Sequence, residues 1–292
     1  PTYMLLDDIK SVLTFAAFRP DADDSETPMN KRFEGRKVLG INISRNMVTW
    51  RGFNRRGKLE AMGEQDGDFA DVASTRGEEW RSLTDDGWCT VSINNRFIIS
   101  LENGLMRAEN TPHLLRTNPR MVLGPKYDRG KRYAICHHPS STASMLLATE
   151  DSMVKVTEDV MRGMGLRPAR VCCGLFALME HALAGISEQR GQGTGNFVLI
   201  GSCEGSIAAL SEQDGQWRDL RCRSGLGTDG VETALQIISP LVAKAPPGTP
   251  VYFISEGLPD SPFRKDLMEQ LERVGARDLT QEDLLWKLIG QH

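Results

Sequence analysis

The sequence predicts an α/β protein of two lobes, each built on a mixed sheet flanked by helices. Three observations lead to this prediction. The length of 292 residues is enough for about two domains. Short apolar stretches of strand type alternate with helical stretches from residue 38 onward. The pattern that opens this region, strand, small or polar turn, strand and hairpin, occurs at 38–50 and returns at 197–210.

The overall composition is that of an ordinary soluble globular chain. The sequence has 39 acidic and 35 basic residues, and its formal net charge is −4. A general nucleic-acid-binding protein would have a basic excess, so we expect no nucleic-acid partner. No stretch approaches the roughly 18 apolar residues of a membrane-spanning helix, and the first ten residues carry two acids where a signal peptide needs bases. We therefore expect neither secretion nor direct insertion into a membrane.

The sequence has six cysteines, at positions 89, 136, 172, 173, 203 and 222. Their spacing matches neither a zinc site nor a small disulfide scaffold, and several lie in apolar runs. We expect buried free thiols. A thiol enzyme that uses Cys172 or Cys173 with His181 is disfavoured, because no activating partner is evident.

Two polar segments divide the chain. Residues 4–18 form an amphipathic helical pattern and 19–37 read as a linker, so 1–37 is an N-terminal arm. Its apolar face could dock on the body, on a partner or on a membrane surface; the body is favoured. The Gly-rich segment 187–195 separates a first lobe, 38–190 with an inserted subdomain, from a second lobe, 191–292.

The expected elements follow from apolar periodicity and turn residues. In the first lobe they are strands at 38–43, 47–53 and 58–65, an irregular segment 66–87 with a short helix near 78–83, two strands within 88–102, a loop at 103–131, a strand at 132–139, a strand or a helix at 140–150, a helix at 150–163, a strand at 169–173 and a helix at 175–183. In the second lobe they are three strands from 197 onward, helices at 228–244, 262–274 and 280–289, and a strand at 251–255. Arg51, Arg55 and Arg56 are expected to be solvated around a hairpin tip.

Five stretches, read in order, resemble the actin-like ATPase superfamily, whose fold is a duplicated, ribonuclease H-like one. Within the superfamily they resemble the type IV pilus assembly protein PilM and the cytoplasmic domain of the type II secretion protein GspL. The stretches are LGINISRNMVTW (39–50), GMGLRPARVCCGLFALMEHAL (163–183), FVLIGSCEGSIAAL (197–210), RSGLGTDGVETALQ (223–236) and VYFISEGLPDSPFRKDLMEQL (251–271). The resemblance covers about 250 residues, from Val38 onward.

The resemblance implies a nucleotide site with an aspartate in each of two phosphate loops to hold hydrated Mg²⁺. This ion needs hard oxygen ligands, and glycines let backbone N–H groups approach phosphate. The first loop departs from that pattern. Asn42 stands at the aspartate position and Ser44 at the glycine position, while Arg45 and Asn46 replace small hydroxyl residues.

The second loop and the adenosine motif depart from the pattern as well. Gly201 stands at the aspartate position and Cys203 at the glycine position, and Glu256 replaces the first glycine of the adenosine motif. Both magnesium carboxylates are therefore missing, and Glu204 is a weak candidate to replace one. We expect a vestigial nucleotide site formed by Asn42, Ser44, Arg45, Asn46, Gly201, Cys203, Glu204, Gly205, Gly225, Gly227, Thr228, Glu256 and Gly257. The glycine-rich stretch 223–230 keeps the best phosphate-like cradle, or is a plain helix start with Thr228 as its N-cap.

The resemblance and these departures together predict a non-catalytic scaffold of a bacterial type IV pilus or type II secretion platform. It implies a partner, the cytoplasmic tail of a bitopic inner-membrane protein, and a cytoplasmic location with recruitment to the inner face of the inner membrane. A homodimer is left open. No catalytic residue, metal ligand or cofactor is expected. The alternative is an actin-like ATPase that binds or weakly hydrolyses ATP with Mg²⁺.

Overall fold

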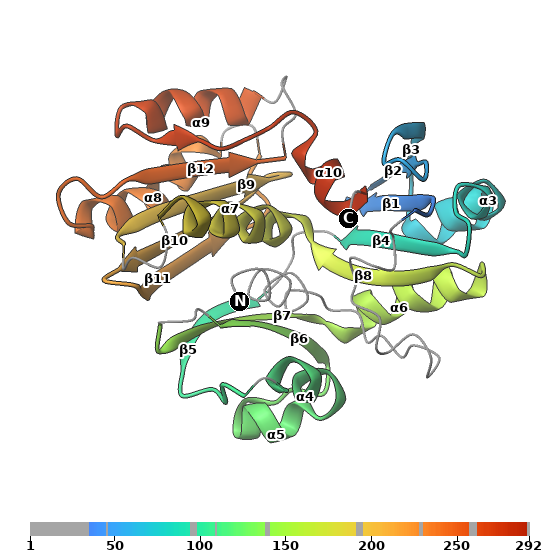
Figure 1. The fold of residues 1–292 in the computed structure, drawn as a ribbon, viewed down its shortest axis with the longest axis horizontal. Helices are drawn as coiled ribbons and strands as arrows, with labels where there is room; N and C mark the ends of the chain where they lie inside the picture. The colour runs from blue at the N-terminus through green and yellow to red at the C-terminus, as the bar shows by residue number, and fades with distance from the viewer. Residues whose placement is uncertain are drawn as a thin grey trace.

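Three β-sheets organise the chain in the structure, which is a computed structural model (Figure 1). The structure describes residues 35–44, 46–93, 98–108, 110–137, 141–190, 195–227, 230–256 and 262–290. The predicted helix at 4–18 lies outside the described residues, as do most of the first linker, Arg45, Thr228 and Gly257.

The first sheet has the strand order β3-β2-β1-β4-β8. Its strands are β1 (Val38–Ile43), β2 (Met47–Phe53), β3 (Leu59–Asp66), β4 (Trp88–Ile93) and β8 (Arg167–Cys173). β1, β2 and β3 form an antiparallel meander, and β4 and β8 run parallel to β1. Helices α3 (Phe69–Ser82) and α6 (Asp151–Gly163) lie against this sheet and contact each other. We refer to this sheet with its helices as the first lobe.

The second sheet repeats the plan of the first, in the order β11-β10-β9-β12-β13. Its strands are β9 (Phe197–Cys203), β10 (Ser206–Gln213), β11 (Gln216–Arg223), β12 (Val251–Ser255) and β13 (Arg277–Asp278). β9, β10 and β11 form an antiparallel meander, and β12 and β13 run parallel to β9. Helices α8 (Val231–Lys244) and α9 (Pro262–Glu272) pack on it to complete the second lobe. The duplication predicted from the sequence is confirmed.

Each half of the chain ends in a helix that packs on the sheet of the other half. α7 (Gly174–Arg190) follows β8 but contacts β9, β12 and β10. α10 (Leu284–Gly290) follows β13 but contacts β1, β4 and β2. A glycine lies beneath each helix: a Cβ on Gly40 would be 3.4 Å from Ile289 Cγ1, and one on Gly201 would be 2.8 Å from Met179 Cγ. The two crossing helices join the lobes.

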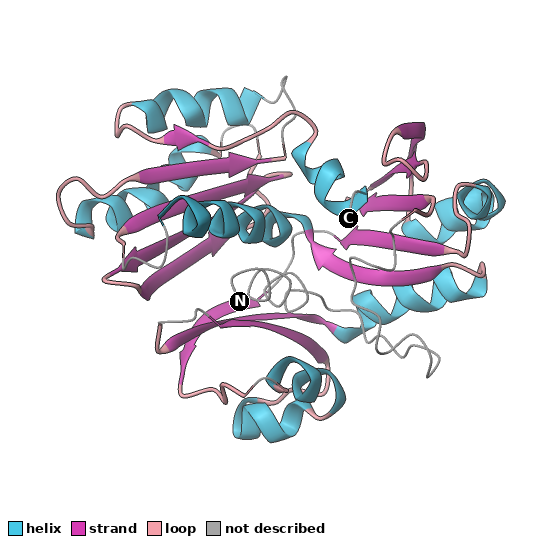
Figure 2. Cartoon of the chain, in the orientation of Figure 1, coloured by secondary structure: helices cyan, strands magenta, loops and turns pink. Residues whose placement is uncertain are grey.

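The third sheet comes from the sequence between β4 and α6. It has the order β5-β7-β6 and consists of β5 (Ile98–Asn103), β6 (Lys131–His137) and β7 (Ala143–Glu150), with α4 (Thr111–Thr117), α5 (Pro119–Leu123) and the short 3₁₀ helix η1 (Gly124–Lys126) beside it. This sheet contacts β11 of the second lobe (Figure 2). Ser141 Oγ accepts a hydrogen bond from the Trp217 backbone N–H at 3.1 Å.

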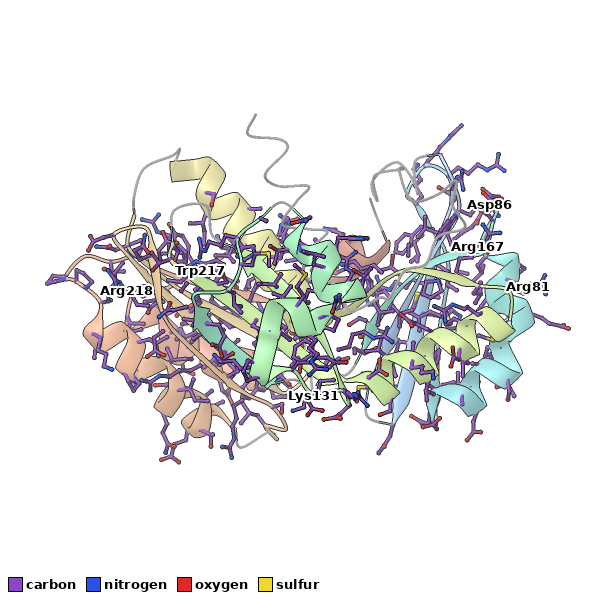
Figure 3. All side chains as sticks on the ribbon, turned by 90° about the horizontal axis from the view of Figure 1, so that it is seen from below. Arg81, Asp86, Lys131, Arg167, Trp217 and Arg218 are labelled. Atoms are coloured by element: carbon purple, nitrogen blue, oxygen red, sulfur yellow. The ribbon has the colours of Figure 1, made fainter. Side chains whose placement is uncertain are left out.

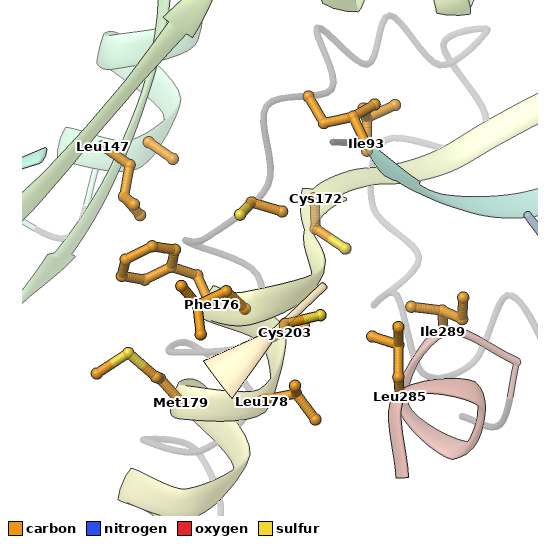
Figure 4. Packing of buried hydrophobic residues seen from close by; sticks show 14 of the residues in the cluster. Ile93, Leu147, Cys172, Phe176, Leu178, Met179, Cys203, Leu285 and Ile289 are labelled. Carbon is orange, nitrogen blue, oxygen red and sulfur yellow. The ribbon is translucent and has the colours of Figure 1, made fainter. Parts of the chain in front are cut away.

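One buried core connects all three sheets. The helices α7 and α10 meet within this core, where a Cβ on Gly174 would be 3.3 Å from both Cys203 Sγ and Leu285 Cδ1 (Figure 4). A second, smaller cluster lies between the second sheet and helices α8 and α9. Charged side chains extend outward from both lobes, among them Arg81 on α3 and Arg218 on β11 (Figure 3). Among the described helices, none has the length and apolar character needed to cross a membrane.

Several sequence-based expectations about elements require correction or completion. Helix α7 runs to Arg190, into the segment 187–195 expected as a linker, and the last helix begins at Leu284 and not at 280. Helix α3 fills most of the segment expected to be irregular, where only a short helix near 78–83 was expected. Two helices, α4 and α5, lie in the expected loop at 103–131, and each begins with a proline in its first turn. The ambiguous stretch 140–150 contains the central strand β7 of the third sheet.

Candidate functional site

The candidate site lies where the carboxyl end of β1 meets the turn between β9 and β10. The Asn42 side chain donates a hydrogen bond from Nδ2 to Glu204 Oε1 at 2.6 Å. The Ser44 hydroxyl donates to the same oxygen, also at 2.6 Å. These residues are about 160 positions apart in the sequence and belong to different lobes. We call this pair of hydrogen bonds the Glu204 bridge.

The backbone of the β9–β10 turn places Glu204 at the junction. Cys203 pairs with Ser206, so Glu204 and Gly205 are the two central residues of the hairpin, with φ of 47° and 70°. The Gly205 carbonyl accepts a hydrogen bond from Leu226 N–H at 2.8 Å, and a Cβ on Gly205 would be 2.4 Å from the Leu226 carbonyl oxygen. Glycine is therefore required here, and the turn is held against the glycine-rich loop before α8.

Glu256 supports the turn from the end of β12. Its Oε1 accepts a 3.4 Å hydrogen bond from the Glu204 backbone N–H, and its backbone carbonyl accepts one from Leu285 N–H at 3.3 Å. The side chain is buried, and burial raises the pKa of its carboxyl group, with a further increase from the nearby Glu204 charge. Among the described residues, neither Glu256 Oε2 nor Asn42 Oδ1 has a hydrogen-bond partner.

The second expected carboxylate position is filled by apolar packing. Gly201 lies beneath α7, and a Cβ there would be 2.8 Å from Met179 Cγ and 3.0 Å from Leu175 Cδ1. An aspartate at this position would overlap the helix. The close packing of α7 on β9 therefore requires a residue without a side chain here. Cys203 is fully buried in the same core. The structure therefore places Gly201 and Cys203 in the packing against α7 and not in contact with the Glu204 bridge.

The structure unites part of the predicted site. Asn42, Ser44, Glu204, Gly205 and Glu256 meet at the junction, and Gly225 and Gly227 lie in the loop that Leu226 ties to Gly205. Asn46 is exposed, and its backbone carbonyl accepts a hydrogen bond from Gly67 N–H at the end of β3. Arg45, Thr228 and Gly257 lie outside the described residues.

The acidic, histidine and cysteine side chains of the described residues bear on metal and thiol chemistry. The described part of the chain contains no group of three or more His, Cys, Asp or Glu side chains arranged to hold a metal ion. None of the six cysteines, all of which lie in the described residues, forms a disulfide bond, and five of them are buried. Burial raises the pKa of the Cys172 and Cys173 thiols, which disfavours the reactive thiolate.

A contact that sequence reasoning missed lies beside the site. Arg51 was expected at a solvated hairpin tip, but its side chain is largely buried. It donates a 3.0 Å hydrogen bond from Nη2 to Asp283 Oδ1, just before α10, and its Nη1 forms a 3.0 Å ion pair with Asp283 Oδ2. Its guanidinium group also lies 4.9 Å from the ring centre of Trp286. Successive side chains of a strand point to opposite faces, so Arg51 lies on the face of β2 opposite to the inward-facing Trp50. The sequence does not show which element covers that face. Arg55 and Arg56 are exposed, as expected.

Comparison with known proteins rests on structure alone. No protein-family model matches the sequence, and no curated protein matches it significantly. The chain is similar to a Bacteroides thetaiotaomicron protein described as having an actin-like ATPase fold and unknown function, with a TM-score of 0.50 and 12% identity over 89% of this chain and 97% of that one. It is similar to the PilM–PilN type IV pilus biogenesis complex, with a TM-score of 0.52 and 13% identity over 87% of this chain and 90% of that one.

The cytoplasmic domain of EpsL, an inner-membrane component of the type II secretion system of Vibrio cholerae, is matched with a TM-score of 0.47 and 10% identity over 87% of this chain and 93% of that one. The likeness to the Bacteroides protein and to the PilM–PilN complex confirms, at the level of the fold, the resemblance seen in the sequence motifs. Two sheets of identical strand order, joined by crossing helices, agree with it. The chain has the actin-like ATPase fold.

Proposed function

We propose that this protein is a non-catalytic scaffold in the assembly platform of a bacterial type IV pilus or type II secretion machine. In this role it binds the cytoplasmic tail of an inner-membrane partner and is recruited to the inner face of that membrane. The fold it shares with the PilM–PilN type IV pilus biogenesis complex, over most of both chains, supports the assembly role.

The Glu204 bridge is the observation that supports a non-catalytic role. Phosphoryl transfer relies on Mg²⁺ and on donors that neutralise phosphate charge. Here Asn42 and Ser44 direct their donors to a carboxylate of the protein itself. Gly201 has no side-chain oxygen, and Met179 fills the space that a longer side chain would need. These features favour a protein that keeps the fold but does not hydrolyse nucleotide.

Calorimetric titration of the full chain with ATP and Mg²⁺ tests the non-catalytic part of the proposal. We expect no measurable heat at millimolar nucleotide and no release of phosphate above the buffer rate. Mg²⁺ alone and ADP with Mg²⁺ serve as controls for heats of dilution and for product binding. Micromolar, Mg²⁺-dependent affinity would contradict the proposal and favour the alternative, an ATP-binding or weakly hydrolysing ATPase.

Fluorescence anisotropy tests the partner. Labelled peptides are made for the cytoplasmic tails of the bitopic inner-membrane proteins of the pilus and secretion machines of the same bacterium. We expect one of them to bind the full chain with micromolar affinity, while a scrambled peptide of the same composition does not. The scaffold role is wrong if no tail binds more tightly than its scrambled control.

A further inference from the structure

The turn that carries Glu204 uses a residue its backbone does not favour. Two-residue hairpins with positive φ at both positions prefer Asn, Asp or Gly at the first. The β10–β11 hairpin follows this preference, with Asp214 at 53° and Gly215 at 69°. Glu204 at 47° instead carries a longer side chain in a conformation that disfavours it. The residue is therefore explained better by what its side chain reaches than by the turn itself.

The side chain of Glu204 reaches two donors on the opposite lobe. Asn42 Nδ2 and Ser44 Oγ both lie 2.6 Å from one carboxylate oxygen, and Asn42 is 5% exposed. Two convergent donors on one oxygen are the arrangement that binds an oxyanion, and such charge-assisted bonds are short. An Asn or Asp at position 204 would be shorter by one methylene group, about 1.5 Å, and could not keep both contacts without a shift of the backbone.

We propose that Asn42 and Ser44 form an oxyanion-binding position that the Glu204 carboxylate occupies from the opposite lobe. The protein then supplies its own anion to two donors of the other lobe. This inference concerns the junction alone, so it stands or falls independently of any pilus or secretion partner.

The Glu204 bridge can be removed without loss of the fold. Glu204 is exposed, so the oxyanion position opens to solvent when its carboxylate is absent. The lobes remain joined by the core shared between α7 and α10 and by the ion pair of Arg51 with Asp283. Removal of the Glu204 bridge should therefore free the position locally, and inorganic phosphate or pyrophosphate should be able to enter it.

The test replaces Glu204 by the residue that its turn prefers. Glu204→Asn keeps the hairpin, removes the negative charge and shortens the side chain so that it no longer reaches both donors. Asp214→Asn makes the matched change in the other hairpin. In metal-free calorimetric titrations with sodium pyrophosphate, we expect Glu204→Asn to bind at least tenfold more tightly than the wild type or Asp214→Asn. The double variant Asn42→Ala with Glu204→Asn should lose this gain.

Amide hydrogen exchange of the full chain gives an independent readout. Glu204→Asn should speed exchange at 42–44, on the lobe opposite the mutation, and pyrophosphate should slow it again; Asp214→Asn should change neither. The proposal is wrong if Glu204→Asn shows neither pyrophosphate binding nor faster exchange at 42–44. It is equally wrong if the wild type binds pyrophosphate as tightly as Glu204→Asn, or if Asn42→Ala leaves the gained binding intact.

Discussion

The two positions where the resemblance leads one to expect magnesium carboxylates differ in what replaces the carboxylate. Asn42 keeps a polar side chain and directs its amide donor toward Glu204. Gly201 has no side chain, and Met179 and Leu175 occupy the space above it. The sequence shows that both carboxylates are missing. It does not show that Asn42 donates a hydrogen bond or that Gly201 makes a packing contact, because both depend on residues of distant elements.

Glu256 is a buried carboxyl group next to a second acid. It is 8% exposed, and burial, followed by the charge of Glu204, raises its pKa above the ordinary value near 4.3. The folded state therefore holds the Glu256 proton more tightly than the unfolded state does. The stability that this proton contributes is fully present below the Glu256 pKa of the unfolded state, and it is lost as the pH rises through the higher Glu256 pKa of the folded state.

We expect Glu256→Gln to unfold with the same free energy as the wild type near pH 4 and to become the more stable of the two as the pH rises. Between the two pKa values of Glu256 the difference grows by about 1.4 kcal/mol per pH unit. Urea unfolding at a series of pH values measures it. Glu78→Gln, on the exposed surface of α3, is the matched control and should show no such trend. A difference that is constant with pH would contradict the prediction.

At the scale of elements, helix α3 was underestimated because most of its residues are polar. Its buried positions, Phe69, Val72, Ala73 and Trp80, still follow helical spacing, and Asp68 caps it by accepting a 2.9 Å hydrogen bond from Ala70 N–H. In α4 and α5 the prolines suggested a loop, but proline suits the first turn of a helix, where its missing N–H would have no partner. Local signals were present for all three helices.

Helix α10 is attached to β2 by a contact between distant residues. Arg51 forms an ion pair with Asp283 and lowers the pKa of that carboxyl group, chiefly through the hydrogen bond between them and further through its charge. Because the Asp283 side chain is 42% exposed, solvent screens the pair and its net contribution is modest. The packing of the guanidinium group over Trp286 adds to it.

We expect Arg51→Met to lower the free energy of unfolding by about 1 kcal/mol at pH 7. The loss should shrink as the pH falls through the lowered folded-state pKa of Asp283, since the protonated carboxyl group no longer attracts the cation. Arg56→Met, at the exposed tip of the same hairpin, should cost little at any pH. Equal effects of the two substitutions in urea unfolding would show that the pair contributes nothing.

At the scale of the whole molecule, the two lobes share their main core, and the second lobe has a smaller cluster of its own under α8 and α9. The main hydrophobic cluster includes residues of all three sheets and of both crossing helices. Exposing the face of one sheet would therefore also expose α7 or α10 and part of the other lobe. Such shared burial favours unfolding in one cooperative step.

We expect amides of β1 and β4 in the first lobe and of β9 and β12 in the second to lose protection at the same urea concentration. The far-UV circular dichroism transition should coincide with them. Glu204→Asn serves as the control, because it removes the Glu204 bridge but leaves the shared core, and it should keep the single transition. Protection lost earlier in one lobe than in the other would contradict a common core.

The sequence by itself determined the two strand meanders, most of the helices and the non-acidic residues Asn42 and Gly201. These features depend on local periodicity, turn residues and residue identity, which can be read without knowing what lies opposite. Only the tertiary structure decided that α7 and α10 cross between the halves, that Met179 fills the space above Gly201, and that Glu204 reaches Asn42 and Ser44. Each of these contacts joins residues far apart along the chain, and their geometry is set by how the two sheets pack.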